Sequence, residues 1–184
     1  MTATFPDVYY KKVIDLLLSQ STAEEIKDDP EKMLTSTLAL LSHFLNLNRG
    51  RIFLWDTQTS RLEIAYSHGL SPEQINLGKY EISEGITGEV LDSGRAILVE
   101  NVSSDYRYLG KLSSLMPPDK RLKSYIAVPI KYEDIDLGVL AVECNSSNDG
   151  DMEANALVLK LVVEEFAKVI YKYNLNDFAV YEAA

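Results

Sequence analysis

Three cations near the middle of the chain are the side chains best suited to bind a ligand. Arg107, Arg121 and Lys123 stand in a sequence of 18 Lys+Arg against 28 Asp+Glu, with a formal net charge of −10. An arginine fork holds a carboxylate through two parallel charge-assisted hydrogen bonds, so these residues favour a small anionic ligand. The alternative is that Asp105 caps a local turn and pairs with Arg107 at the surface.

The wall of such a pocket would be mostly apolar, with a few placed polar groups. Aromatic residues occur on both sides of these cations in the sequence, and the segment 83–92 adds aliphatic side chains. With Arg107 as the polar group, the residues expected to bind the ligand are Phe53, Trp55, Ile86, Thr87, Val90, Tyr106 and Tyr125.

No combination of residues indicates an enzyme or a metal site. Cys144 is the only cysteine, which excludes an internal disulfide and a cysteine-based zinc site. His43 and His68 have no second histidine or cysteine nearby in the sequence. No nucleophile–base pair and no paired carboxylates stand out, so we expect neither catalysis nor a cofactor.

The glycines at 85, 88 and 94 could suggest a phosphate-binding loop. Such a loop places its glycines between a strand and the first turn of a helix, with a lysine following, and that lysine is missing here. The alternative is that small residues let this helix sit close to the sheet, since glycine inside a helix otherwise costs about 1 kcal/mol.

Composition narrows the class of protein further. Hydrophobic residues make up 46% and charged residues 25%, as in an ordinary globular domain. A chain this acidic repels phosphate backbones and anionic membrane surfaces, so we expect no direct nucleic-acid binding. No signal peptide and no apolar run near the ~20 residues that span a bilayer can be recognised, which predicts a cytoplasmic protein away from the membrane.

Periodicity predicts the elements that must position these residues. Hydrophobic residues at helical spacing predict helices over 6–20, 30–45, 83–92 and 151–174. Alternating or continuous apolar runs predict strands over 51–55, 62–66, 96–99, 124–131 and 137–144, with a long irregular segment over 101–123. Hairpins make neighbouring strands antiparallel, and terminal helices must cover a sheet face.

The predicted fold is therefore α+β. A central antiparallel sheet of about six strands carries the N- and C-terminal helices on one face and the short helix with the long loop on the other. We expect a helix and connector over 1–29, the domain proper over 30–174, and a loose tail over 175–184.

The last helix has apolar residues on more than one face, and only one face can cover the sheet. The second apolar stripe would remain exposed to solvent unless it packed against the same helix of a second copy or against the chain's own first helix. The first possibility predicts a homodimer with an interface formed by Tyr9, Val13, Leu16, Leu17, Val162, Phe166, Val169, Ile170 and Tyr173.

Four sequence motifs together resemble the GAF domain family. They are Ser83-Glu-Gly-Ile-Thr-Gly-Glu-Val-Leu-Asp-Ser-Gly94, Asp105-Tyr-Arg-Tyr108, Tyr125-Ile-Ala-Val-Pro-Ile130 and Leu137-Gly-Val-Leu-Ala-Val-Glu143. The resemblance covers roughly residues 30–173 and implies a GAF-like sheet. It is less specific for function, because one fold hosts many ligands.

Among GAF domains, the chain resembles the N-terminal regulatory domain of NifA-type activators of nitrogen-fixation genes. The resemblance implies a sensory domain of a sigma-54-dependent activator, a small ligand such as 2-oxoglutarate, and a PII-type signal protein as a possible partner. The Walker motif of the attached ATPase is absent from this sequence, because Asp105–Leu112 departs from it at both ends. The alternative is a ligand-free module that dimerises and docks a signal protein, with a pocket filled by its own aromatic side chains.

Overall fold

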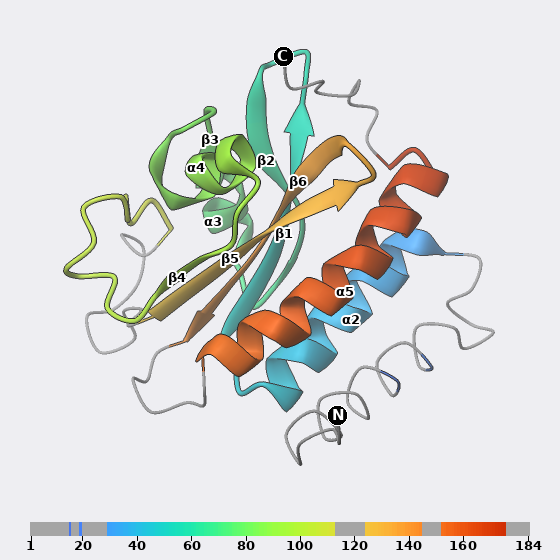
Figure 1. Ribbon diagram of the computed structural model, residues 1–184, viewed down its shortest axis with the longest axis horizontal. Coiled ribbons are helices and arrows are strands. Elements are labelled where there is room, and N and C mark those ends of the chain that lie inside the picture. Colours follow the sequence, from blue (N-terminus) through green and yellow to red (C-terminus); the bar gives the residue numbers. More distant parts are fainter. Residues whose placement is uncertain (1–14, 16–18, 20–28, 113–123, 145–151, 176–184) are drawn as a thin grey trace, which may run out of the picture.

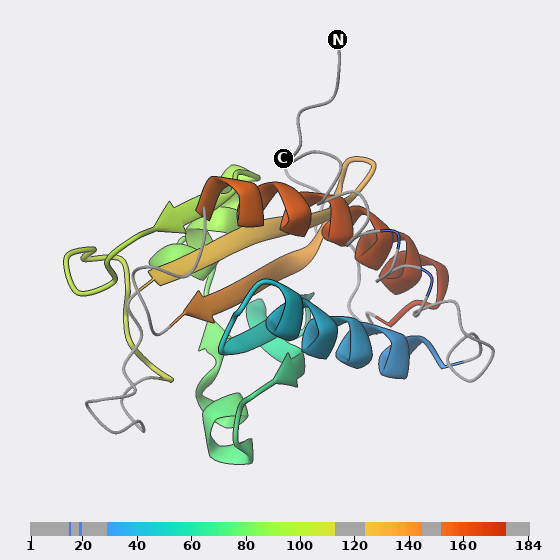
Figure 2. The same ribbon diagram turned by 90° about the horizontal axis from the view of Figure 1, so that it is seen from below.

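The computed structural model describes residues 29–112, 124–144 and 152–175, together with the helical residues Asp15 and Ser19. One antiparallel sheet forms the middle layer (Figure 1). Two long helices lie side by side on one face of this sheet, and a short helix lies on the other (Figures 1 and 2). The predicted α+β architecture is confirmed.

The sheet has six strands in the order β3-β2-β1-β6-β5-β4, and all neighbouring pairs are antiparallel. The strands are β1 (Arg49–Asp56), β2 (Arg61–His68), β3 (Lys79–Tyr80), β4 (Ile97–Val99), β5 (Ser124–Tyr132) and β6 (Ile135–Cys144). The helices are α2 (Pro30–Phe44), α3 (Pro72–Leu77), α4 (Gly85–Ser93) and α5 (Met152–Lys172).

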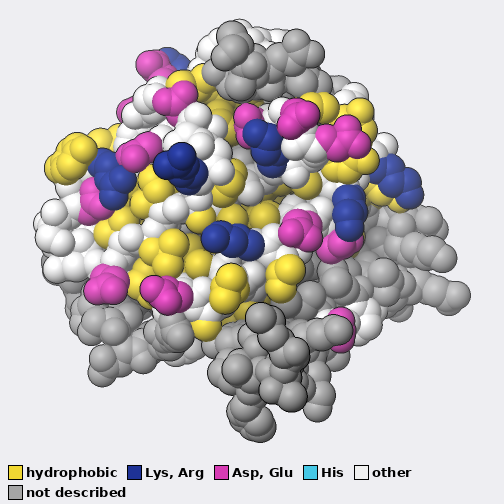
Figure 3. Space-filling model, viewed as in Figure 1, with side chains coloured by type: hydrophobic (Ala, Val, Ile, Leu, Met, Phe, Trp, Pro, Cys, Tyr) yellow, Lys and Arg dark blue, Asp and Glu magenta, His cyan; other side chains and the backbone are white. Residues whose placement is uncertain are grey.

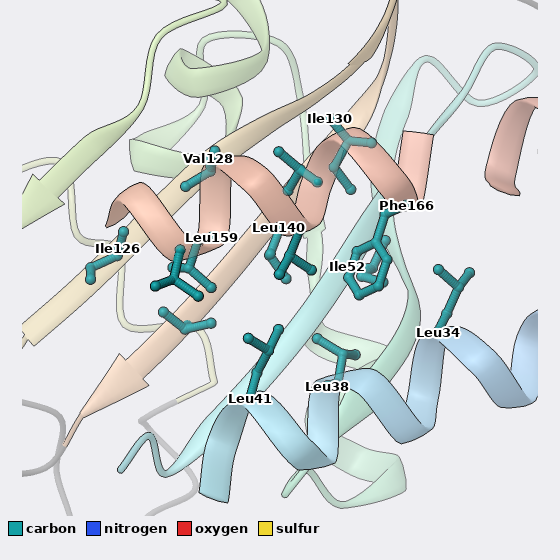
Figure 4. Packing of buried hydrophobic residues seen from close by; sticks show 14 of the residues in the cluster. Leu34, Leu38, Leu41, Ile52, Ile126, Val128, Ile130, Leu140, Leu159 and Phe166 are labelled. Atoms are coloured by element: carbon teal, nitrogen blue, oxygen red, sulfur yellow. The ribbon is translucent and has the colours of Figure 1, made fainter. Parts of the chain in front are cut away.

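Helices α2 and α5 build the larger core with one face of the sheet. Asp29 caps α2 by accepting from the Lys32 amide, and Pro30 occupies the first turn. Figure 4 shows that the apolar stripes of both helices meet the inward-facing side chains of the central strands. This core includes Leu34, Leu38, Leu41, Ile52, Ile126, Val128, Ile130, Leu140, Leu159 and Phe166, all at most 2% exposed.

Strand β1 feeds two cores because successive side chains point to opposite faces. Ile52 and Leu54 belong to the core under α2 and α5. Phe53 and Trp55 belong to a second, smaller core under α4. Strand β1 is therefore covered on both sides.

Some elements differ from the sequence-based expectation. Helix α4 starts at Gly85, not at residue 83 as predicted, and its N-cap Glu84 makes no side-chain capping bond. The Ser83 side chain donates to Asp92 Oδ2 at 2.6 Å. Helix α3 was not predicted, although Ser71 and Gln74 form a capping box around Pro72. The β5–β6 turn needs no glycine, because Glu133 itself takes a positive φ of 52°.

The expected helix over 6–20, the connector to residue 28 and the tail from residue 176 lie outside the described residues, apart from Asp15 and Ser19. None of the helices that the structure describes is long and apolar enough to span a bilayer.

Candidate ligand-binding site

A small cavity lies between the sheet and the segment 107–112, on the face opposite α2 and α5. Its volume is about 10 Å³, which is room for roughly one water molecule. Side chains from four strands, α4 and this segment therefore close the site almost completely. They are Arg51, Tyr80, Ile86, Thr87, Arg107, Tyr108, Leu109, Gly110, Lys111, Leu112, Tyr125 and Glu143.

Strand register brings the polar residues of the floor together. Glu143 on β6 pairs with Arg49 on β1 and with Tyr125 on β5. Arg51 lies two positions beyond Arg49 and so points to the same face of the sheet. A carboxylate on a central strand thereby comes into contact with cations from its neighbour.

Two arginines share this one carboxylate. Arg49 Nε lies 3.0 Å from Glu143 Oε2, and Arg51 Nη2 donates to Glu143 Oε1. The three side chains are only 6%, 2% and 0% exposed, so the cluster carries one excess positive charge away from water. Burial is the largest single influence on the pKa of the Arg51 guanidinium and lowers it, but the attraction of Glu143, Tyr125 and Tyr80 together with the hydrogen bond to Glu143 raises the pKa overall.

Aromatic rings surround the Arg51 guanidinium. Its central carbon lies 5.4 Å from the Tyr125 ring centroid and 5.7 Å from that of Phe53, both within cation–π range. The Tyr125 hydroxyl is 2.9 Å from the Thr87 hydroxyl of α4. Burial raises the pKa of the Tyr80 phenol, which therefore stays protonated at neutral pH.

Helix α4 is held over the floor by two glycines. Gly85 takes a positive φ of 63°, a conformation that side chains rarely adopt. A Cβ at Gly88 would lie 2.3 Å from the Glu81 carbonyl oxygen. The small residues therefore allow α4 to approach residues 81–83 closely. The sequence had suggested a close approach of this helix to the sheet instead.

The segment 107–112 forms the roof of the cavity and is fastened at its C-terminal end. Lys111 Nζ lies 2.7 Å from both Glu84 Oε1 and the Lys79 carbonyl oxygen, and 4.4 Å from the Tyr80 ring centroid. Partial burial of Glu84 acts to raise the pKa of its carboxyl group. The hydrogen bond from Lys111 acts in the opposite direction, and the pKa is lowered overall. Gln74 of α3 adds a hydrogen bond to the Leu112 carbonyl oxygen at 3.2 Å.

Arg107 lines the cavity, but acidic neighbours compensate its charge. Its guanidinium contacts Asp105 Oδ2 at 2.7 Å and both Glu89 carboxylate oxygens at 3.1 Å. The hydrogen bond between Asp105 and Arg107 lowers the pKa of Asp105 and raises the pKa of Arg107. The local ion pair considered as the alternative in the sequence is therefore present, while Arg121 and Lys123 lie outside the described residues.

The structure brings only part of the predicted set into the cavity wall. Ile86, Thr87, Arg107 and Tyr125 line it. Phe53, Trp55 and Val90 are buried in the adjoining small core. Tyr106 is 92% exposed, so the prediction that it lines the ligand site is wrong. The turn that points Arg107 into the cavity points Tyr106 to solvent.

Sequence reasoning missed Arg51, Glu143, Tyr80 and Lys111. Arg51 is the first residue of the predicted strand over 51–55. Its spacing of two from Phe53, and of four from Trp55, places all three side chains on one face. An arginine in phase with buried aromatic residues was the signal in the sequence.

The expected dimer residues also need correction. Val162, Phe166 and Ile170 are at most 1% exposed and pack against the sheet, so they cannot face a second copy. Val169 is half-buried and Tyr173 is 43% exposed. Tyr9, Val13, Leu16 and Leu17 lie outside the described residues.

Other hydrophobic side chains of α5 remain exposed. Leu157 is 59%, Leu161 46% and Tyr171 48% exposed. Figure 3 shows the face that carries α5, where hydrophobic side chains gather among charges of both signs. Within the described part of the chain, no three His, Cys, Asp or Glu side chains come close enough to hold a metal ion.

Comparison with known proteins agrees with this architecture. Nitrogen fixation protein VnfA of Azotobacter vinelandii is 26% identical over 166 residues, which are 90% of this chain and 32% of VnfA. A Nif-specific regulatory protein of the same organism is 30% identical over 146 residues, 76% of this chain and 27% of that protein. The chain thus spans about a third or less of the curated relatives it matches.

A solved structure supports the fold independently. The GAF domain of a phosphoenolpyruvate-protein phosphotransferase from Coxiella burnetii superposes with a TM-score of 0.80 at 16% identity, over 94% of this chain and 98% of that one. The family model described as GAF domain matches residues 29–170. The chain is a member of the GAF domain family, similar to the regulatory domains of Nif-specific activators.

Proposed function

We propose that this chain is the sensory domain of a NifA-like, sigma-54-dependent transcriptional activator, and that it binds a small metabolite in the cavity beneath residues 107–112. The observation that carries the proposal is the convergence of charged, hydroxyl and aromatic side chains on this one cavity. Pockets that recognise small molecules combine apolar walls with a few such polar groups. The regulatory proteins that the chain resembles support the assignment.

Movement of the roof segment 107–112 would be the response of the domain to a ligand. A cavity of about 10 Å³ has no space for a metabolite, so binding requires residues 107–112 to move outward. The contacts of Lys111 with Glu84 and Lys79 would have to break or re-form. A ligand with higher affinity for the open form shifts the domain toward it, and an attached output module can respond to that shift.

The proposal includes a homodimer through the helical face. Leu157 and Leu161 lie one helical turn apart on the exposed side of α5 and would pack against a second copy. Movement of the roof would then reach the dimer through the sheet that α4 and α5 share.

A second candidate is a ligand-free module that dimerises and docks a PII-type signal protein. The small volume of the cavity, lined by Tyr80, Tyr108 and Tyr125, favours this alternative. In that case the Arg51–Glu143 pair is a purely structural feature of the small core.

Thermal unfolding with a metabolite panel separates the two candidates. The panel comprises 2-oxoglutarate, other small carboxylates, nucleosides, nucleotides and cyclic nucleotides. A ligand at about 100 times its Kd stabilises the folded state by roughly 2.7 kcal/mol, which raises the melting temperature measurably. If every compound leaves the melting temperature unchanged at millimolar concentration, the sensory function fails and the docking module is favoured.

A further inference from the structure

Helices α2 and α5 leave one edge of the sheet uncovered on their side. Packed helices lie about 8–10 Å apart and neighbouring strands about 4.8 Å apart, so two helices cover about four strands. Helix α2 packs on β1 and β2, while α5 packs mainly on β5 and β6. Strand β4 lies at the edge of the sheet, beyond β5 (Figure 1). None of the described helices lies beside α5 over this edge strand.

A groove of about 560 Å³ lies at this position, between α5 and the strands β4 and β5. Leu98 of β4 lines it, because its neighbours Ile97 and Val99 contribute to the small core on the opposite face of the sheet. The buried side chains of Val128 and Val163 are also part of the lining. The groove therefore has an apolar floor on which a further helix can pack.

The walls of the groove carry cations in an otherwise acidic chain. Arg95, Lys131 and Lys160 line it, and the single carboxylate among the described lining residues is Glu164. Of these cations, only Lys131 forms an ion pair with a described carboxylate, at 3.3 Å from Asp136 Oδ1. A local excess of cations in a chain with a formal net charge of −10 favours an anionic partner at this place.

The strand edge at the groove favours a helix over an additional strand. In the described structure only residues 125–127 of β5 pair with β4, so the next residues of β5 have no strand on that side. Pro129, which has no N–H to donate, and Lys131 follow directly and line the groove. Proline and lysine on an edge oppose the pairing of a further strand. A helix needs no such pairing, because its backbone hydrogen bonds are internal.

We infer that this groove binds an acidic amphipathic helix of another protein. The apolar stripe of that helix would pack on Leu98 and the two valines, and its carboxylates would meet Arg95 and Lys160. A second copy of this chain is a poorer occupant, because a two-fold contact centred on the groove would bring the same cations of both copies together. The groove lies on the opposite face of the sheet from the ligand cavity, so the inference does not depend on a metabolite binding there.

Fluorescence anisotropy on the complete 184-residue chain tests the inference with three stapled synthetic helices. The first carries leucines along one helical stripe and glutamates on its other faces. The second has lysine in place of every glutamate, and the third contains the residues of the first in an order that destroys the stripe. We expect the first helix to bind about tenfold or more tightly than either of the others, a difference of about 1.4 kcal/mol or more. Raising the salt concentration from about 50 mM to about 500 mM should weaken its binding.

Substitution of the two unpaired cations tests the role of the groove itself. Arg95 and Lys160 are exposed, and surface substitutions usually change stability by no more than about 0.5 kcal/mol. The chain with Arg95→Glu and Lys160→Glu should therefore fold and bind the acidic helix about tenfold or more weakly. Lys32→Glu with Arg61→Glu changes the net charge equally at exposed positions of α2 and β2. This control should keep the affinity within about twofold of the parent's, because salt screens distant charges.

Four results would overturn the inference. Absence of binding by the acidic helix would remove the docking site, and equal binding of the acidic and basic helices would remove the role of the cations. Equal losses in the groove variant and in the control would assign the effect to net charge. A dimeric parent chain that becomes monomeric in Leu98→Gln, measured by light scattering, would assign the groove to a second copy.

Discussion

Glu143 is the buried carboxylate that pairs with both arginines of the cavity floor. It is fully buried and is the only ion-pair partner that the described structure gives to Arg49 and Arg51. Removal of one member of a buried ionic cluster leaves the others uncompensated, which typically costs about 3–5 kcal/mol. We therefore predict that Glu143→Ala lowers the free energy of unfolding by about this amount, measured by urea denaturation.

The control for this prediction is the exposed pair of Glu63 and Lys79, with side chains 30% and 46% exposed. Because solvent screens such pairs, Glu63→Ala should cost no more than about 1 kcal/mol. Equal effects of the two substitutions would show that the buried cluster contributes no more than a surface ion pair.

Asp105 gives the site a pH dependence with a defined sign. Its hydrogen bond with Arg107 lowers the pKa of the carboxyl below the usual 3.8. A lowered pKa in the folded state adds stability above the unfolded value, and this stability is lost as the pH falls through the folded value. Urea midpoints of the parent chain and Asp105→Asn should therefore differ at about pH 7 and converge in strong acid. A difference that persists unchanged into acid would exclude the carboxylate as its source.

At the scale of elements, Gly138 marks a close approach of β6 to β1. A Cβ at Gly138 would lie 1.9 Å from the Phe53 carbonyl oxygen, a contact that only movement of a central strand could relieve. Gly94 ends α4 with a φ of 61°, and a Cβ there would meet no atom within 4 Å. The first glycine is required by space and the second by backbone conformation.

We predict unequal costs for alanine at these two positions. Gly138→Ala should destabilise the domain by about 3 kcal/mol or more, because strained cores show the largest effects of single substitutions. Gly94→Ala should cost only about 1–2 kcal/mol, the usual penalty of a left-handed conformation. Urea denaturation of both variants checks the order, and a larger cost at Gly94 would contradict the packing of β6 against β1.

The exposed face of α5 makes the proposed dimer testable. Leu157→Glu with Leu161→Glu places charges on exposed positions and leaves the buried Val162 and Phe166 in place. We predict that the doubly substituted chain is monomeric by light scattering at micromolar concentration and still unfolds cooperatively, with a melting temperature that no longer depends on protein concentration. Leu77→Glu on α3, at a side chain 42% exposed away from α5, should leave the dimer intact. A monomeric parent chain would remove the dimer from the proposal.

For the molecule as a whole, the sequence was sufficient to predict the architecture. The buried residues of α2, such as Leu34, Leu38 and Leu41, and those of the strands recur at regular spacing. Such spacing can be recognised in the sequence without coordinates. The motifs at 83–94, 125–130 and 137–143 fixed the family, which the match over residues 29–170 confirms.

The site was less predictable, because it depends on contacts between distant strands. Arg51 and Glu143 are 92 positions apart, and only the register of β1 with β6 brings them together. Arg107 lies in the cavity wall as expected, but Asp105 and Glu89 compensate its charge. Which of several cations remains uncompensated cannot be deduced from residue types alone.

The most direct test of the account is to locate the bound ligand by ¹H–¹⁵N NMR. The chain would be titrated with whichever compound of the panel raises its melting temperature most. The account predicts amide shifts concentrated at Thr87, residues 107–112, Tyr125 and Glu143, with smaller changes along α5. Shifts confined to α2 and α5, with the cavity residues unmoved, would contradict a ligand site beneath the roof.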